Sequence, residues 1–289
     1  MAFRTVIIST HSKLEYSLGY LVYKTVNESK RIFVSEIHTL IIESTVVSIT
    51  TSLLAELIKN KINVIFCDEN KNPTSQLLSI YGSFETSKRI KNQINWTEEI
   101  KNKVWKRIVR EKIFGQANFL LKEKLFEEGE QLMFYRSEVM DGDITNREGH
   151  AAKVYFNKIF GEGFSRSSGE IINAYLNYGY TILLSAINRI VVSSGYLTQL
   201  GIHHCNTFND FNFSSDLIEP FRTFVDQKAK LVNIENFKME MIDLLNNEVK
   251  INGKNQTLLN ALQIYCASVF SSLESNDPKK IIFPDSYDL

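Results

Sequence analysis

The sequence predicts an α+β protein, with a mainly β domain at the N-terminus and a larger all-α domain after it. Up to about residue 80, short β-branched or apolar runs alternate with turn residues, which is typical of strands. From residue 84 the apolar residues recur at helical spacing, among many Lys and Arg. Only four prolines and thirteen glycines occur in 289 residues, which favours long uninterrupted elements. We therefore divide the chain into residues 1–83 and 84–289.

Composition narrows the class of protein. Hydrophobic residues make up 44% of the chain and charged residues 23%, which is typical of a folded globular protein rather than a disordered one. The three cysteines are far apart and form no C-x-x-C pair, so neither a disulfide framework nor a zinc knuckle is indicated. The N-terminal residues lack the apolar core of a signal peptide. We expect a cytoplasmic protein with reduced thiols.

The longest apolar stretch, residues 178–192, is interrupted by Asn188 and Arg189. A membrane-spanning helix needs about 20 consecutive apolar residues. This stretch therefore predicts a buried helix, and we expect no association with a membrane.

In the β domain, strands are expected at 5–9, 18–25, 31–34, 39–42 and 61–67. A single helix is expected over 48–60, because four apolar side chains there share one face and Ser48 is suited to be its N-cap.

In the second domain, the pattern is helical from 84 to 129, and further helices are expected at 145–160, 168–194, 215–231, 234–246 and 258–273. The run Ile251-Asn252-Gly253-Lys254 is a hairpin turn signal. Residues 278–289 contain two prolines and show no periodicity, so we expect them to be extended or docked on a partner.

The neutral total charge, 33 basic against 33 acidic residues, conceals two blocks of opposite sign. Residues 88–124 contain eleven basic and four acidic side chains, whereas 126–143 contain six acidic side chains and one arginine. The basic block is either an ordinary solvated helix face or a surface that contacts phosphates.

Residues 201–226 gather the side chains best suited to bind a metal. His203, His204 and Cys205 come just before an expected helix that carries Asp216 and Glu219. Carboxylates three residues apart lie on the same side of a helix. One histidine with two carboxylates suits Mg²⁺ or Mn²⁺.

A further carboxylate, Glu148, stands in another polar helix turn. Thr145 and Glu148 have the spacing of a capping box, so an N-capping role is the alternative for Glu148. Glu219 comes before Pro220 and also fits a first-turn carboxylate that the helix dipole favours. Spacing alone leaves both the metal and the structural roles open.

Two segments resemble a known family. Residues 146–161, NREGHAAKVYFNKIFG, and 201–226, GIHHCNTFNDFNFSSDLIEPFRTFVD, are similar to the two signature blocks of the universal CRISPR-associated integrase family, in its type II version. The resemblance covers almost the whole chain. It includes THSKLEY at 10–16, VIFCDENKNPT at 64–74 and NAYLNYGYTILLSAINR at 173–189.

The resemblance implies that Glu148, His204 and Glu219 are the catalytic residues and bind one Mg²⁺ or Mn²⁺. His203 is not in this set of ligands. Asp216 is expected to interact with the metal only indirectly, through water or through another ligand. The implied activity is that of a metal-dependent DNA endonuclease and integrase. Such an enzyme inserts short protospacer DNA into the repeat array by 3′-hydroxyl transesterification.

The family likeness also implies partners. Residues 1–83 would build a homodimer, and 84–289 would hold the active site. Two dimers would bind around one dimer of a small ferredoxin-like partner, a four-to-two complex, with double-stranded protospacer DNA that has 3′ overhangs and with repeat DNA. Other acquisition proteins and the effector nuclease are further expected partners. The alternatives are a general metal-dependent DNA or RNA nuclease and a structural subunit that holds DNA.

Because incoming DNA varies in sequence, it must be bound mostly through its backbone. In the basic block, the residues expected to be most exposed are Lys88, Arg89, Lys103, Lys106, Arg107 and Arg110. Close to the implied metal ligands, the candidates for phosphate contact are Arg147, Lys153 and Arg222. Ordinary ion pairing with Asp216, Glu219 or Asp226 is the alternative for these three.

His11 and Tyr16 are expected in the first loops of the β domain. Aromatic side chains in such loops are candidates to stack on bases at splayed DNA ends. The alternative is that both are ordinary turn and core residues.

Overall fold

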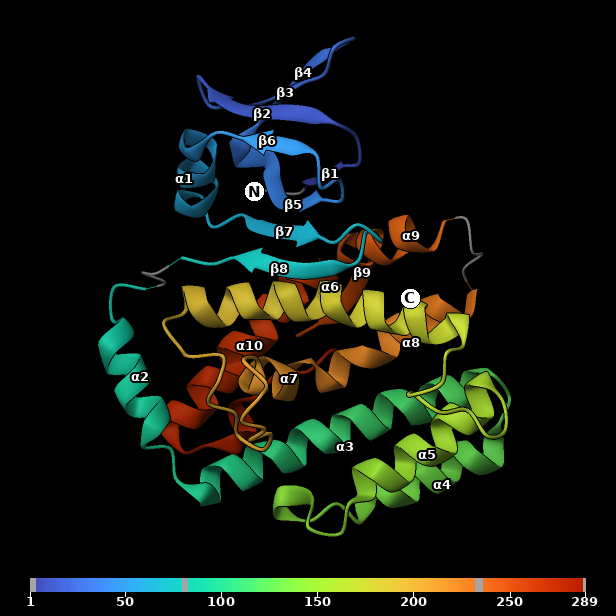
Figure 1. Cartoon of the computed structure of the whole chain (residues 1–289). Coiled ribbons are helices and arrows are strands. Elements are labelled where there is room, and N and C mark those ends of the chain that lie inside the picture. Colours follow the sequence, from blue (N-terminus) through green and yellow to red (C-terminus); the bar gives the residue numbers. More distant parts are fainter. Residues whose placement is uncertain (1–3, 80–82, 232–235, 288–289) are drawn as a thin grey trace. The chain divides into compact units, whose positions relative to one another are not determined.

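The computed structural model describes residues 4–79, 83–231 and 236–287 (Figure 1). The chain forms two compact units, residues 1–83 and 84–289. The first is rich in strands and the second is helical, so the predicted α+β class is confirmed. Tyr81 and Gly82, where the composition changes, lie outside the described residues, and so does the start of the helix expected at 234.

In the described part of the N-terminal unit, the strands form two four-stranded sheets. The first has the order β1-β5-β7-β8 and the second has the order β4-β3-β2-β6. The strands of the first sheet are β1 Arg4–Ile8, β5 Ile37–Ile42, β7 Asn63–Cys67 and β8 Pro73–Leu77. Those of the second are β2 Ser12–Ser17, β3 Tyr20–Lys24, β4 Ser29–Phe33 and β6 Val47–Ile49.

One core joins the two sheets and helix α1, Thr51–Lys59. Strand β5 is buried along its whole length, as expected for a strand with parallel neighbours on both sides. Leu14 and Leu21 from the second sheet contribute to the same core as Leu53 and Leu57 from α1. The sequence missed β2 and β8 because these strands carry many polar residues, and it missed β6 because this strand has only three residues.

The predicted N-cap of α1 is wrong. Ser48 lies in β6, and the residue at the N-cap position is Thr50, whose carbonyl accepts from Leu54 N at 3.2 Å. The helix begins after this residue because β6 pairs with β2 as far as Ile49.

The described helices of the second unit are α2 Thr86–Ile94, α3 Glu98–Lys122, α4 Phe126–Ser137, α5 Arg147–Phe160, α6 Ile171–Ser193, α7 Asn212–Ile218, α8 Arg222–Leu231, α9 Phe237–Asp243 and α10 Leu258–Ser275. The predicted helical stretch from 84 to 129 is divided into three. Thr97 caps α3, with its hydroxyl accepting from Ile100 N at 3.4 Å, and Lys124 at φ 64° turns the chain after it.

Helix α3 runs through the unit and packs against α4, α5, α7, α8 and α10 (Figure 1). Helix α6 is apolar and largely buried, and it ends where Gly195 adopts a φ of 86°. Within the described residues, no helix is both long and apolar enough to cross a membrane.

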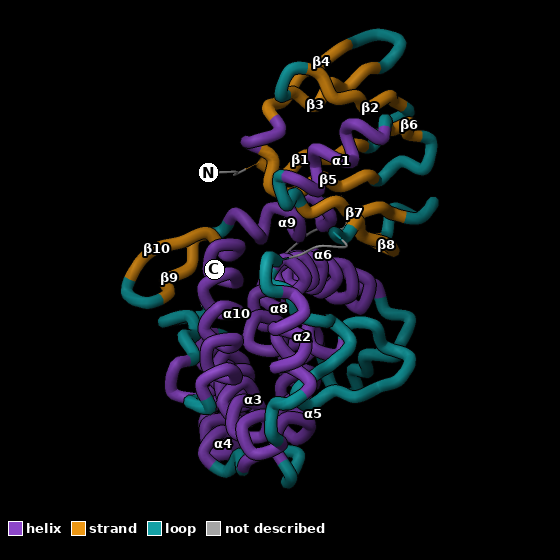
Figure 2. Tube along the Cα trace, turned by 90° about the vertical axis from the view of Figure 1, so that its left-hand side faces the viewer, coloured by secondary structure: helices purple, strands orange, loops and turns teal. Residues whose placement is uncertain are grey.

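The end of the chain packs on its own unit rather than standing extended. Tyr287 is 2% exposed, and its carbonyl accepts from Gln227 Nε2 at 2.6 Å. Pro284 pairs with Ile251 of the predicted hairpin, which is confirmed as β9 Glu248–Ile251 and β10 Lys254–Thr257 beside α10 (Figure 2). Burial of this aromatic ring explains why the aperiodic segment packs against its own unit.

Candidate functional site

The start of α5 leaves Glu148 without a capping role, so the predicted capping box is wrong. The N-cap is Asn146, at φ 51°, and its side chain accepts from Gly149 N at 3.2 Å. The Asp143 carboxylate accepts from Arg147 N at 2.9 Å and from Glu148 N at 3.0 Å. Because these two residues satisfy the exposed N–H groups, the Glu148 carboxylate makes its contact elsewhere.

The helix expected over 215–231 is broken at Glu219. Residues Glu219–Phe221 form a 3₁₀ turn between α7 and α8. Pro220 has no N–H to donate to the carbonyl four residues earlier, so a regular helix cannot continue through it. Glu219 is 3% exposed at this break, and its carboxylate points to α3 rather than capping a helix.

Asp216 organises the loop that carries His204. It is fully buried, and its Oδ2 accepts from Ile202 N at 2.7 Å and from His203 N at 3.1 Å. Its Oδ1 accepts from His204 N at 3.0 Å and lies 2.6 Å from His204 Nδ1. A carboxylate accepts, so Nδ1 carries a proton, and in the neutral imidazole Nε2 presents its lone pair.

Gly201 allows this close approach. A Cβ at that position would lie 2.7 Å from Asp216 Oδ2 and would also collide with the His204 carbonyl oxygen. A side chain there would push the loop away from the buried carboxylate.

Lys112 of α3 joins the two glutamates. Its Nζ lies 2.5 Å from Glu148 Oε1 and 2.5 Å from Glu219 Oε2. Arg222 Nε contacts the other oxygen of Glu219 at 2.9 Å. Sequence reasoning missed Lys112, which it counted only as part of the basic block. The available signal was its spacing, because it follows Ile108 and Val109 by four and three residues on the buried face of α3.

The charges in this cluster shift one another's pKa values. Burial would raise the pKa of Glu219, but Arg222 and Lys112 outweigh it and lower the pKa to about 2. Burial would lower the pKa of Lys112, yet Glu148 and Glu219 raise it above its ordinary value. Glu219 is therefore a carboxylate, and Lys112 is an ammonium, at neutral pH.

His204 lies on the same side of α3, toward its N-terminal end. Its ring packs edge-on to Trp105 at 5.6 Å, and His203 stacks on Trp105 at 4.3 Å. Trp105 and Lys112 are seven residues apart, about two helical turns. The hydrogen bond to Asp216 raises the pKa of His204, burial opposes this shift, and Glu219 and Glu148 add to it.

The imidazole is accessible from outside. The His204 side chain is 40% exposed and lines a pocket of about 410 Å³. The two histidines have different surroundings: His203 is stacked on Trp105, whereas His204 faces the pocket.

The donor chemistry fits a divalent metal. The carboxylates of Glu148 and Glu219 and the Nε2 of His204 are the oxygen-rich set with one imidazole that Mg²⁺ and Mn²⁺ accept. Asp216 orients the imidazole through Nδ1, as carboxylates do for metal-binding histidines. In residues 4–79, 83–231 and 236–287, no three His, Cys, Asp or Glu side chains are gathered closely enough to hold an ion. The Lys112 ammonium lies between the two glutamates instead.

The six residues expected to be most exposed in the basic block are mostly tied down, which corrects that expectation. Only Lys88 is exposed, and the other five are half-buried. Their described contacts are Lys88 with Glu85, Arg89 with Tyr196 and Glu274, Lys103 with Glu99, Lys106 with Asp141, and Arg107 with the Pro278 carbonyl, while Arg110 is half-buried on α3. Acidic side chains pair with Lys88, Arg89, Lys103 and Lys106, whereas Arg107 contacts a backbone carbonyl.

The other residues expected to contact DNA lie in different surroundings. Arg147 pairs with Glu138 at 3.7 Å, and Arg222 pairs with Glu219, so ion pairing accounts for both. Lys153 is exposed on α5. His11 is exposed just before β2, whereas Tyr16 lies within β2 and packs against the core.

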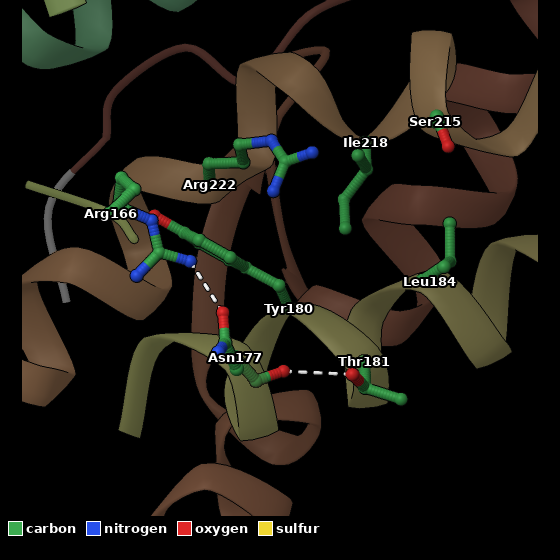
Figure 3. A pocket seen from close by; sticks show the side chains of 8 residues that line it. All are labelled: Arg166, Asn177, Tyr180, Thr181, Leu184, Ser215, Ile218 and Arg222. Atoms are coloured by element: carbon green, nitrogen blue, oxygen red, sulfur yellow. Dashed lines mark hydrogen bonds between the residues drawn. The ribbon is translucent and has the colours of Figure 1, made fainter. Parts of the chain in front are cut away.

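A pocket of about 260 Å³ opens beside Arg222, between α6 and α7 (Figure 3). Its lining carries two guanidinium groups, from Arg166 and Arg222, and no carboxylate. The two groups lie over the Tyr180 ring at 5.2 and 4.5 Å from its centroid. Arg166 is held by the side-chain oxygens of Asn173 and Asn177, each at 2.6 Å. Neutral amides leave its positive charge uncompensated.

Comparison with known proteins gives consistent matches over the whole chain. The sequence model of the family described as CRISPR associated protein Cas1 matches residues 5–263. A CRISPR-associated endonuclease Cas1 from Neisseria meningitidis is 31% identical over 297 residues, covering 99% of this chain and 97% of the relative.

Two solved structures share the fold. A casposase bound to integration product has a TM-score of 0.77 at 18% identity and covers 95% of this chain and 91% of its own. A Cas6-RT-Cas1–Cas2 complex has a TM-score of 0.75 at 18% identity, covering 96% of this chain and 36% of that longer chain. From the family match and the identity over its whole length, the chain belongs to the family of CRISPR-associated protein Cas1.

Proposed function

We propose that this protein is a divalent-metal-dependent DNA endonuclease and integrase of CRISPR adaptation, which inserts short protospacer DNA into the repeat array. One observation carries the proposal: two glutamates meet at a buried cation on α3, and a histidine oriented by a buried aspartate packs against Trp105, about two turns earlier on the same helix. The relative from Neisseria meningitidis is named an endonuclease, and the casposase was solved with an integration product. These names support phosphodiester chemistry at this cluster.

The proposed reaction is a transesterification at phosphorus. The 3′-oxygen of the incoming DNA forms a bond to phosphorus as it loses its proton, and the bond from phosphorus to the 3′-oxygen of the repeat strand breaks. The departing 3′-oxygen of the repeat strand receives a proton and becomes a 3′-hydroxyl. Bound Mg²⁺ or Mn²⁺ would supply Lewis-acid stabilisation of the charge on the phosphate oxygens.

The residues of this chain have separate tasks in that reaction. Glu148, Glu219 and His204 would hold the ion. Asp216 keeps the imidazole in the tautomer that presents Nε2. Arg222 fixes one oxygen of Glu219. The positive charge of Arg222 beside Glu219 would stabilise negative charge that develops on a phosphate bound there.

The partners are proposed on family grounds. The solved complex that contains Cas1 and Cas2 supports assembly with a small second acquisition protein. In the arrangement we propose, residues 1–83 form a homodimer. Two such homodimers bind one dimer of the ferredoxin-like partner.

The pocket beside Arg222 is proposed to contact a DNA phosphate next to the metal centre. We expect Arg166→Gln to weaken binding of a fluorescent duplex with 3′ overhangs, measured by anisotropy in EDTA. The slope of log affinity against log salt should fall by about one, because one phosphate contact is lost. Arg166→Lys should restore the slope, and Lys254→Gln on the distant hairpin is the control. An unchanged slope in Arg166→Gln would exclude this contact.

The function itself is tested by strand transfer. Purified protein, with its small partner, is mixed with labelled 3′-hydroxyl DNA and a repeat-bearing plasmid, in Mn²⁺, in Mg²⁺ or in EDTA. We expect joined DNA with either metal and none in EDTA, because in EDTA no Lewis acid stabilises the charge on the phosphate oxygens. DNA that ends in a 3′-deoxy nucleotide is the control and should not be joined.

Two results would support the alternatives. Hydrolysis products without joined DNA, with the partner present, indicate a general nuclease. DNA binding without cleavage or joining in either metal indicates a structural subunit. Joining at the same rate in EDTA would contradict the metal mechanism.

A further inference from the structure

We propose that the Lys112 ammonium is a built-in counter-cation of the metal centre, which holds Glu148 and Glu219 together in the metal-free protein and competes with the divalent ion for them. This inference rests on the proposed metal site and assigns it a residue of α3. Lys112 acts here as a positioning residue, because it contacts the proposed ligands and not the DNA.

The contacts show that the glutamates share this one nitrogen. Nζ lies 2.5 Å from an oxygen of each glutamate, and the Lys112 side chain is 10% exposed. An ammonium has three donors and no acceptor, so two of its N–H groups point at these carboxylates. Without the Lys112 ammonium, the negative charges of the two carboxylates would repel one another in a largely buried site, which would lower the stability of the fold.

The formal charges of the four side chains in direct contact balance without a metal. Lys112 and Arg222 contribute two positive charges, and Glu148 and Glu219 contribute two negative ones. A divalent ion added to this cluster would bring an excess of two positive charges at short range. Repulsion of that kind is strong where water is excluded. One cation must therefore withdraw when the metal binds.

Lys112 is the cation that can withdraw. Its ammonium sits at the end of a flexible four-carbon stem. Arg222 is held on both sides, by Glu219 at 2.9 Å and by the Tyr180 ring, whose centroid is 4.5 Å away. Metal binding then requires the state in which Lys112 has left the carboxylates. The apparent metal affinity is reduced by the fraction of protein in that state.

Lys112→Met tests the proposal, because Met has a similar length and no charge. In EDTA, its Tm should fall by about 10 °C, since one partner of a buried ionic cluster is lost. At the same time, Mn²⁺ binding measured by calorimetry should tighten by about tenfold, because no ammonium competes. These two changes in opposite directions are not expected from simple damage to the fold.

Lys230→Met is the matched control. It removes one positive charge from a surface pair with Glu123 on the same unit. Exposed pairs contribute little, so its Tm should change by no more than about 2 °C, and its Mn²⁺ affinity should stay the same.

Several outcomes would overturn the inference. An unchanged Tm of Lys112→Met in EDTA would do so, as would Mn²⁺ affinity equal to or weaker than that of the wild type. If neither protein binds Mn²⁺, the proposed function fails and the inference falls with it. If the wild type binds Mn²⁺ and Lys112→Met does not bind it more tightly, only the inference fails.

A double variant keeps the test decisive if Lys112→Met does not fold. Lys112→Met with Glu148→Gln removes one charge of each sign, so the repulsion between the glutamates is gone. Folding of this double variant, seen as a cooperative thermal transition, supports the proposal. Failure of the double variant to fold overturns it.

Discussion

Glu148→Gln is expected to reduce strand transfer by about a thousandfold or more, because a carboxylate ligand of the proposed metal would be lost. Gln has nearly the same size as Glu, and the capping contacts at the start of α5 come from Asp143 and Asn146, which remain. Lys112 also keeps Glu219 as its partner. The measurement is the rate of joining labelled DNA to a repeat-bearing plasmid in Mn²⁺.

The fold of Glu148→Gln should persist, so the loss must come from chemistry. Its Tm in EDTA should stay within a few degrees of the wild type, since the Glu219 pair remains. Glu162→Gln, in the exposed loop after α5, is the control and should join DNA at the normal rate. Joining by Glu148→Gln at the wild-type rate would remove this residue from the proposed site.

Asp216→Asn is expected to weaken Mn²⁺ binding by about 10- to 100-fold, the usual effect of removing a carboxylate that orients a metal-binding histidine. The carboxylate accepts from three backbone N–H groups and from His204 Nδ1. An amide nitrogen would face some of these donors and repel them. The free energy of unfolding should therefore fall by about 3 kcal/mol as well.

The two effects of Asp216→Asn are measured separately, by calorimetric titration with Mn²⁺ and by chemical denaturation in EDTA. Asp210→Asn, an exposed change in the same loop, is the control and should alter neither quantity. Glu219→Gln supplies the contrast, because it should abolish binding of Mn²⁺ altogether. If Asp216→Asn abolishes binding and Glu219→Gln only weakens it, the roles assigned to these carboxylates are reversed.

The separation of Asp216 from Glu219 shows what tertiary contacts add. In the sequence the two carboxylates are three residues apart, and a continuous helix would have made them equivalent. Pro220 breaks that helix, so Asp216 points to the backbone of the loop at 202–204 and Glu219 points to Lys112 and Arg222. The partners of each carboxylate come from segments distant in the chain.

The basic block at 88–124 shows what the sequence could not predict. Its net charge is visible in the sequence, but the exposure of its members is not. Lys106 pairs with Asp141, 35 residues later, and Arg107 donates to the carbonyl of Pro278, 171 residues later. Charge counting over a window cannot see such pairs, because they depend on which helices pack against α3.

The sequence by itself determined the α+β class, the change of composition near residue 83, the hairpin at 251–254 and the two blocks that contain Glu148, His204 and Glu219. These features depend on local periodicity, turn residues and family motifs, all of which are written in short segments. Only the tertiary structure decided that Asp143 and Asn146 cap α5, that Asp216 is buried behind His204, and that Lys112 joins the glutamates. The cap of α5 depends on the left-handed backbone at Asp143 and Asn146, which the local pattern does not reveal. The contacts of Asp216 and Lys112 depend on segments that packing around α3 brings together.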